Sequence, residues 1–392
     1  MNRRGDLEEA TAPWLRSLGF RFDPFHYLES SDDVRLGAYL VRHELAGMAW
    51  DGPPTLVFAP AGGGKTTLRM YAAYACWLGQ GYGQVFPLPY LPEQAHAPTP
   101  IMHLAAIAQG GAVALLIGLA HFPRRLLDLG HPERRAVATL LDAALPAPLS
   151  YYLDQLRSDN NPARLARRLE KSYRLPTPTT TDLIAELCSA LEASLPQQTV
   201  SLEPHERFEL LKTVILDGLR FRKLVIQIDN LDSIAETINN PEAMAERILW
   251  PLEQAVRWAE QGVILNAFLP SELEASLGQR SPELLGVVRQ ARVVWSDTLL
   301  AEVIRLRLGD ATGGLFNSLD AVSSPSLKAI EATIVAAALP LPREVILLTS
   351  RVLAAYAQRV GEAPGQIQPG DLDQGLEWYS LHRVDPGPLA QA

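Results

Sequence analysis

Residues 55–67, Thr-Leu-Val-Phe-Ala-Pro-Ala-Gly-Gly-Gly-Lys-Thr-Thr, constrain this chain more than any other segment of its sequence. A short apolar run leads into three glycines, a lysine and two threonines, and a helical pattern follows. A glycine-rich turn between a strand and a helix directs backbone N–H groups at an anion, and the helix N-terminus adds partial positive charge. A lysine at this point reaches the β- and γ-phosphates of a nucleotide. The segment therefore predicts a phosphate-binding P-loop.

The predicted phosphate site consists of the residues that close this turn and open the helix, namely Gly62, Gly63, Gly64, Lys65, Thr66 and Thr67. The hydroxyl of Thr66 is also the first expected Mg²⁺ ligand. The chain has only 5 lysines among its 35 basic residues, so a lysine at this position favours a compact charge suited to phosphate. Ala59 replaces the first glycine of the pattern G-x-x-x-x-G-K-[ST], although alanine can still end a strand. The alternative is a glycine-rich turn ahead of an ordinary helix.

Composition restricts the class of protein. With 392 residues and 47% hydrophobic residues, the chain is long enough for two or three globular domains. A net charge of −9 argues against nucleic acid as the main ligand. The two cysteines, Cys76 and Cys188, have no metal-binding or redox spacing, and the first residues are polar. We therefore expect a cytoplasmic protein with reduced cysteines.

Residues 101–122 form an uncharged stretch of 22 residues between two prolines. Its length would allow it to span a bilayer. His103, Gln109, His121 and many alanines favour a buried interior helix instead. We expect the interior helix, with no membrane association, and keep the membrane span as the alternative.

Apolar runs alternate with helical patterns along much of the chain. Strands are expected at 55–59, 85–90, 224–228, 263–269 and 292–295, and helices at 65–80, 299–308 and 325–360. This alternation predicts an α/β fold with a parallel sheet and right-handed crossovers. The expected domains are an N-terminal segment at 1–50, a core at 51–300 with a helical insertion at 101–220, and a helical lid and tail at 301–392, the tail starting near 366.

A second chemical signal is Asp229, which ends the apolar run 224–228. A carboxylate at the tip of a buried strand beside the P-loop strand can hold Mg²⁺ opposite Thr66, as in a Walker-B pattern. The pattern of apolar residues followed by Asp is weak alone, because capped strand ends look similar. Paired with the P-loop, it makes Asp229 the second expected metal ligand.

With these two motifs, residues 20–360 resemble the AAA+ ATPases, especially the branch near origin-recognition initiators and the STAND signalling ATPases. The resemblance implies a P-loop NTPase three-layer sandwich with a helical lid that binds ATP and Mg²⁺. In that family an acid commonly follows the Walker-B aspartate and polarises the attacking water. Asn230 stands here instead, which implies slow hydrolysis unless Asp232 or Glu236 substitutes.

The resemblance implies further site residues. Asn266 matches the polar sensor residue at the end of the strand after Walker B, with a buried structural asparagine as the alternative. Arg343, after Pro342 at a helix start, matches the lid arginine that reaches the γ-phosphate, with a surface arginine as the alternative. Phe25, after Pro24, resembles a residue that packs by the adenine, with simple packing in the protein interior as the alternative. Arg289 or Arg292 is the candidate arginine finger supplied to a neighbouring subunit, and either can be a plain surface charge.

Together these features predict an ATP-binding, slowly hydrolysing switch of AAA+/STAND type. Self-association and separate effector or sensor proteins are the expected partners, as in bacterial signalling or defence systems. One alternative is a nucleotide-binding scaffold that does not hydrolyse. Another is a DNA-loading ATPase, for which the helix face of Arg164, Arg167, Arg168 and Lys171 would bind the nucleic-acid backbone. A third is a P-loop small-molecule kinase. For the basic residues of that helix face, a solvated basic face is the first alternative, and a docking surface for an acidic partner is the second.

Overall fold

The computed structural model describes residues 12–30, 32–33, 35–47, 52–78, 85–92, 98–159, 164–165, 182–196, 201–234, 237–360 and 365–383. These residues form two compact units, which we treat separately. The sheet unit comprises Glu44–Ala59 and Lys65–Arg292, and the helical unit comprises Met1–His43, Pro60–Gly64 and Val293–Ala392. This division differs from the expected one, because the N-terminal segment groups with the C-terminal region.

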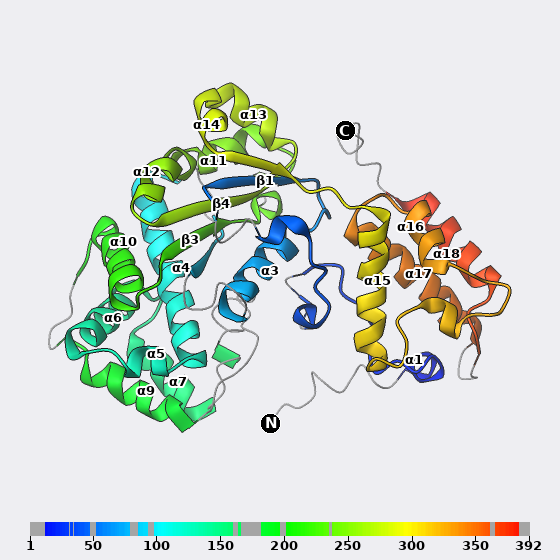
Figure 1. Cartoon of the computed structure of the whole chain (residues 1–392), viewed down its shortest axis with the longest axis horizontal. Coiled ribbons are helices and arrows are strands. Elements are labelled where there is room, and N and C mark those ends of the chain that lie inside the picture. The colour runs from blue at the N-terminus through cyan, green and yellow to red at the C-terminus, as the bar shows by residue number, and fades with distance from the viewer. Residues whose placement is uncertain are drawn as a thin grey trace. The chain divides into compact units, whose positions relative to one another are not determined.

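The sheet unit contains a five-stranded sheet of order β2-β3-β4-β1-β5 (Figure 1). Its strands are β1 (Thr55–Ala59), β2 (Val85–Tyr90), β3 (Lys223–Ile228), β4 (Val263–Pro270) and β5 (Arg289–Arg292). Every neighbouring pair runs parallel, which confirms the predicted parallel α/β sheet. Two positions in this arrangement were predicted wrongly. β4 lies between β1 and β3, so Asp229 does not follow a strand beside β1, the strand that precedes the glycine turn.

The second wrong position is the last strand, which we expected at 292–295. β5 ends at Arg292, and the residues that follow belong to the helical unit. Within that unit the indole N–H of Trp295 donates to the carbonyl of Gly63 at 2.9 Å. This buried contact lies wholly within the helical unit.

Strand β2 carries two prolines, Pro87 and Pro89, inside its hydrogen-bonded ladder. Proline lacks the N–H that a central strand needs on both sides, so it is confined to sheet edges. β2 is an edge strand and pairs with β3 alone. The two prolines of β2 are therefore consistent with its position at the edge of the sheet.

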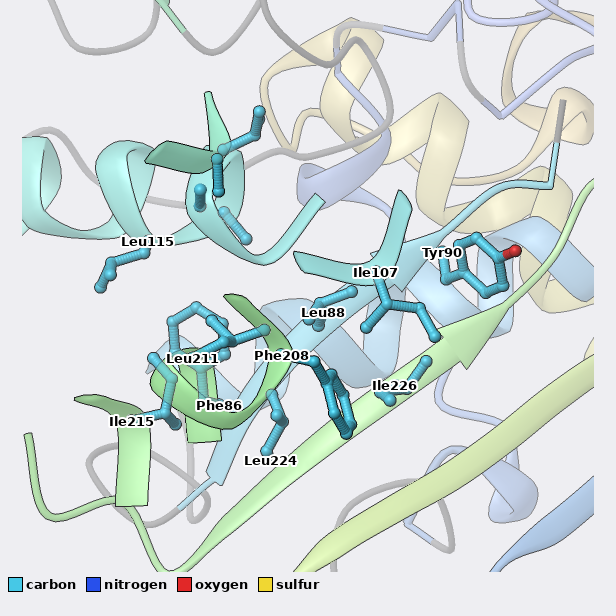
Figure 2. Close-up of a cluster of buried hydrophobic side chains, with 14 of the residues drawn as sticks. Phe86, Leu88, Tyr90, Ile107, Leu115, Phe208, Leu211, Ile215, Leu224 and Ile226 are labelled. Atoms are coloured by element: carbon cyan, nitrogen blue, oxygen red, sulfur yellow. The ribbon is translucent and has the colours of Figure 1, made fainter. Parts of the chain in front are cut away.

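One face of the sheet packs on the helical insertion between β2 and β3. The described helices of this insertion are α4 (Pro100–His121), α5 (Arg124–Leu127), α6 (His131–Ala144), α7 (Leu149–Asp159), α9 (Asp182–Ala193), α10 (Pro204–Lys212) and the π-helix η4 (Thr213–Gly218). Alternate strand residues, among them Phe86, Leu88, Leu224 and Ile226, point into this apolar cluster (Figure 2). The alternation follows from the two-residue period of a strand.

Helix α4 is the uncharged stretch of residues 101–122. Among the described residues it is the one helix long and apolar enough to span a membrane, and 61% of its most apolar window is buried inside the protein. It packs against β2, α6 and α10. A Cβ added to Gly111 would lie 2.5 Å from a methyl group of Leu211, so this glycine permits the close approach of α10. These contacts bury much of α4 within the sheet unit.

The sheet unit also contains helical elements that lie outside the insertion. They are η3 (Glu44–Gly47), α3 (Lys65–Leu78), η5 (Leu231–Ser233), α11 (Pro241–Glu253), α12 (Ala255–Glu260), α13 (Leu273–Arg280) and α14 (Pro282–Val287). Helix α3 contacts β1, β2 and β4, directly after the glycine turn. Helix α3 therefore packs on β1, β2 and β4, in the sheet that carries the predicted site.

The helical unit consists of α1 (Pro13–Ser17), η2 (Leu36–Ala38), α15 (Asp297–Thr312), η6 (Leu319–Val322), α16 (Ile330–Ala337), α17 (Pro342–Val360) and α18 (Pro369–His382). The prediction of a short tail from residue 366 is wrong, because α18 is a helix packed along α17. Gly375 makes this packing possible, since a Cβ there would lie 3.0 Å from backbone atoms of Val352.

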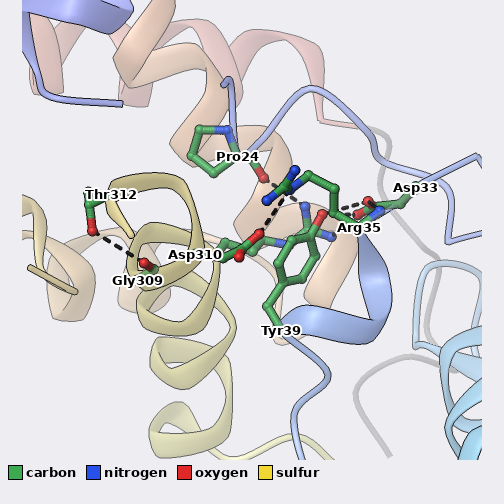
Figure 3. A network of polar contacts seen from close by, with 8 residues as sticks. Pro24, Asp33, Arg35, Tyr39, Gly309, Asp310 and Thr312 are labelled. Atoms are coloured by element: carbon green, nitrogen blue, oxygen red, sulfur yellow. Dashed lines mark hydrogen bonds and ion pairs between the residues drawn. The ribbon is translucent and has the colours of Figure 1, made fainter. Parts of the chain in front are cut away.

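A buried ion pair binds the N-terminal segment to α15 in the helical unit (Figure 3). Arg307 of α15 pairs with Asp33 at 3.1 Å and donates to the carbonyl of Pro24 at 2.7 Å. The hydroxyl of Tyr39 donates to the same carboxylate, and burial raises the pKa of this phenol. These contacts explain why residues before 43 group with the C-terminal region.

We expect Arg307→Met to destabilise the protein by about 3–5 kcal/mol, because it leaves the Asp33 carboxylate buried without its cation. Arg35→Met is the matched control, since Arg35 also pairs with an aspartate, Asp310, but is 42% exposed. Arg35→Met should lower the free energy of unfolding by about 1 kcal/mol or less. Urea unfolding measures both, and equal losses would contradict the assigned role of the buried pair.

A pH effect should come from His103 on α4. Nδ1 of this imidazole is hydrogen-bonded with the hydroxyl of Tyr90 at 2.5 Å, and burial lowers the pKa of His103 to about 4. The folded state therefore binds fewer protons than the unfolded state between that value and about 6.5. Stability from this group is complete above about pH 6.5 and is lost as the pH falls toward 4.

His103→Gln should remove about 2 kcal/mol of the stability difference between pH 7.5 and pH 5, as measured by denaturant unfolding at both values. His205→Gln, at an exposed position on α10, is the matched control. An unaltered pH dependence in the first variant would show that His103 does not titrate as described.

Candidate functional site

The glycine turn has the strand–turn–helix form expected from the sequence. β1 ends at Ala59, and α3 begins at Lys65. Gly62 and Gly64 have φ angles of 75° and 86°, which L-residues with a side chain rarely adopt. The N–H of Gly63 donates to the carbonyl of Pro60 at 3.0 Å and closes the turn. Two of the three glycines are thus required by backbone conformation.

Lys65 is held at the carboxyl edge of the sheet. Its side chain is 6% exposed, and its ammonium group donates to the carbonyl of Ala59 at 3.2 Å. The same group pairs with the carboxylate of Asp232 at 2.9 Å. Asp232 lies in η5, directly after β3, and is 31% exposed. The structure therefore brings the predicted lysine and the segment after Asp229 together, although their strands are not neighbours.

Asp229 is engaged by a residue that the sequence analysis did not select. Arg69, on α3, donates through Nε to Oδ2 of Asp229 at 2.8 Å, and both side chains are 1% exposed. In the part of the chain that the structure describes, Nη1 of Arg69 and Oδ1 of Asp229 have no hydrogen-bond partner. A buried guanidinium thus neutralises the expected metal ligand.

Asn230 shapes the turn between these two acids. Its φ of 69° is left-handed, a conformation that asparagine tolerates better than most residues. η5 begins immediately after it and carries Asp232. Glu236, the other candidate substitute acid, lies outside the described residues.

The expected position of Asn266 at the end of its strand is wrong. Asn266 lies in the middle of β4, paired in register with Thr55 at the start of β1. Its side-chain oxygen accepts from the backbone N–H of Thr55 at 3.1 Å. The residue at the end of this strand is Pro270, paired with Ala59. The buried amide therefore joins two strands four residues before the edge where Lys65 lies.

Arg343 occupies the helix start that the sequence predicted. α17 begins at Pro342, and a Cβ added to Gly62 would lie 3.0 Å from Cβ of Arg343. Its guanidinium pairs with Glu29 at 2.7 Å. Within the helical unit, Arg343 therefore packs directly on the glycine turn.

The predicted adenine contact of Phe25 has a packing explanation. Phe25 is 1% exposed, and its N–H donates to Oδ1 of Asp23 at 2.9 Å. The preceding carbonyl, of Pro24, accepts from Arg307. A ring buried to this extent serves the interior of the protein and is not open to a base.

The two candidate arginine fingers are the first and last residues of β5 instead of preceding it. Arg292 forms two short contacts with Glu274, at 2.7 and 2.9 Å, and Arg289 is exposed. On the predicted basic face, Arg164 pairs with Asp159 at 3.1 Å. The other members of that face, Arg167, Arg168 and Lys171, lie outside the described residues.

Sequence reasoning missed Arg69 and Trp295. The signal for Arg69 was its spacing, because a residue four positions after Lys65 lies on the same helix face. Trp295 packs on the turn within the helical unit, where a Cβ added to Gly64 would lie 3.2 Å from its ring. No local pattern connects Trp295 to Gly63, which lies 232 positions earlier in the chain. Burial raises the pKa of Cys188, as expected for a thiol in the interior.

Comparison of the chain with protein-family models, with curated proteins and with solved structures finds no match. The geometry of its own residues is therefore the basis for a functional assignment.

Proposed function

We propose that this chain binds a nucleoside triphosphate, ATP, at the turn of residues 60–66 and works as a nucleotide-dependent switch with slow hydrolysis. The observation that carries the proposal is the environment of Lys65. A nearly buried ammonium group follows two left-handed glycines and pairs with a carboxylate oxygen of Asp232 at 2.9 Å. A phosphate oxygen has the same charge and accepts the same hydrogen bond, so it can replace that carboxylate.

The exchange of Asp232 for phosphate provides the switching step. Asp232 lies in η5, next to the end of β3, and is partly exposed. When phosphate takes its place on Lys65, the acid loses its partner and η5 is free to adopt a second position. A ligand shifts such an equilibrium by its differential affinity for the two states. The expected partners, further copies of the chain and separate effector or sensor proteins, would respond to this change.

Slow hydrolysis follows from the acids near Lys65. Asn230 can orient a water molecule but cannot accept its proton. Asp232 can serve as a base only after it leaves Lys65. What the chain supplies is therefore mainly positioning and positive charge from Lys65 and the backbone N–H groups of the turn.

Asp229, the second of the two expected Mg²⁺ ligands with Thr66, does not fit a metal site in its observed surroundings. The carboxylate of Asp229 is bound by Arg69 at 2.8 Å and is buried. Among the described residues there is also no group of three or more His, Cys, Asp or Glu side chains that could hold a metal. We therefore assign no step of the proposed function to Mg²⁺.

The class we propose is an AAA+/STAND-like P-loop ATPase of the cytoplasm. It is supported by the strand–turn–helix around Lys65, the acid at the end of β3 and the arginine at the start of α17 on Gly62. The second candidate is a scaffold that binds ATP without hydrolysing it. The lack of an acid at Asn230 and the pairing of Asp232 favour that candidate, and a phosphate-release assay with ATP separates the two.

Replacing the lysine tests the binding site directly. Lys65→Ala should weaken binding of a fluorescent ATP analogue about 10-fold to 100-fold, because a charged hydrogen bond to phosphate is lost. Lys212→Ala is the matched control, since Lys212 is also mostly buried and pairs with an acid, Glu209, at 2.8 Å. Unchanged affinity in the first variant would end the proposal.

Replacing Asp232 tests the exchange. Asp232→Asn should tighten binding of the same analogue by up to about fivefold, because the phosphate no longer displaces a partly exposed ion pair. Glu209→Gln removes one negative charge from the Lys212 pair and should leave the affinity unchanged. Weaker binding after Asp232→Asn would show that this acid supports the nucleotide instead of competing with it.

A further inference from the structure

We infer that Arg69 takes the place of a divalent cation at Asp229, so that nucleotide binding by this chain does not require Mg²⁺. The inference rests on the proposed function and specifies the form of its ligand, a nucleoside triphosphate without a bound metal. It is carried by the geometry of α3 and of the end of β3, both in the sheet unit.

Arg69 is placed to act with Lys65. The two residues are four positions apart on α3, so their side chains leave the helix on one face, one turn apart. Lys65 pairs with Asp232 at 2.9 Å, and Arg69 pairs with Asp229 at 2.8 Å. One helix face thus supplies two positive charges to the acids that follow β3, which is the charge that one Mg²⁺ ion would supply.

The Arg69–Asp229 pair leaves hydrogen-bonding capacity unused. Only Nε of the guanidinium donates to the carboxylate, and Nη1 has no partner among the described residues. Oδ1 of Asp229 also lacks one there. A guanidinium presents five N–H donors in a planar fork that matches phosphate. Arg69 therefore holds Asp229 through one donor and keeps further donor capacity beside Lys65.

The same pair opposes Mg²⁺ at Asp229. Mg²⁺ requires octahedral coordination and retains several water molecules, which need space. Both side chains of the pair are 1% exposed, so no space for a hydrated ion is open at the carboxylate. A divalent ion would also lie close to the positive guanidinium and be repelled by it. Moving Arg69 away would leave a buried charge without its partner, which is strongly unfavourable.

The test compares binding of a fluorescent, non-hydrolysable ATP analogue to the full chain in excess Mg²⁺ and in EDTA. We expect dissociation constants that agree within about threefold. Binding at least about tenfold weaker in EDTA would overturn the inference and leave the proposed function intact. An absence of binding in both buffers would instead refute the proposed function, so the two failures are distinguishable.

Variants then test whether Arg69 is responsible. Arg69→Gln should make binding at least about tenfold tighter in Mg²⁺ than in EDTA, because Asp229 becomes available to the metal. Arg69→Lys, which keeps the charge, should remain independent of Mg²⁺. Arg247→Gln is the matched control, since Arg247 is a buried arginine of the same unit that donates to the carbonyl of Pro92.

Thermal unfolding of each variant shows whether it is folded. A folded Arg69→Gln protein that binds equally well in both buffers would overturn the role of Arg69. If that variant does not fold, the comparison of the unaltered chain in Mg²⁺ and EDTA still decides whether the metal is needed.

Discussion

The parallel pairing of β1, β4 and β3 is the constraint on which the candidate site depends. Because the strands run in one direction, the glycine turn after β1 and the acids after β3 emerge at the same edge of the sheet. The register adds a detail. Ile228, the last residue of β3, pairs with Ala267, whereas the last residue of β1 pairs with Pro270. β3 thus stops three residues short of the end of β4, and the chain after it turns back toward Lys65 through the left-handed Asn230.

Pairing with carboxylates explains how the protein holds positively charged arginine side chains in its interior. An ion that leaves water loses hydration energy, which only a close counter-ion and further hydrogen bonds offset. Arg307 and Asp33 satisfy this condition in the helical unit, and Arg69 with Asp229 satisfies it in the sheet unit. The two ion pairs differ in whether their polar atoms all have hydrogen-bond partners. Arg307 also donates to a carbonyl and stacks on Tyr39, whereas the second pair keeps an unmatched donor and an unmatched acceptor. Fully matched buried pairs are structural, and incompletely matched ones are where a ligand or water can be accommodated.

The strands other than β5, and the position of Lys65, could be predicted because their signals are local. Residues 85–90 form a strand with the expected limits, and α17 starts at Pro342, where fixed proline φ favours a first turn. The rest depended on distant contacts. The helix at 369–382 is stable through its packing on α17, and Asn266 is fixed by a backbone group 211 positions away. Neither sequence pattern contains that partner, and the same is true of Arg69 and Asp229, which only the sheet order brings together.

The prolines of β2 have a consequence for how the molecule meets other chains. In a parallel ladder alternate residues turn their N–H groups outward, and on β2 Pro87 and Pro89 occupy two alternate positions of the strand that ends the sheet. That border offers no amide hydrogen at either position. An incoming strand would meet gaps in its bonding pattern, which protects this margin against edge-to-edge aggregation.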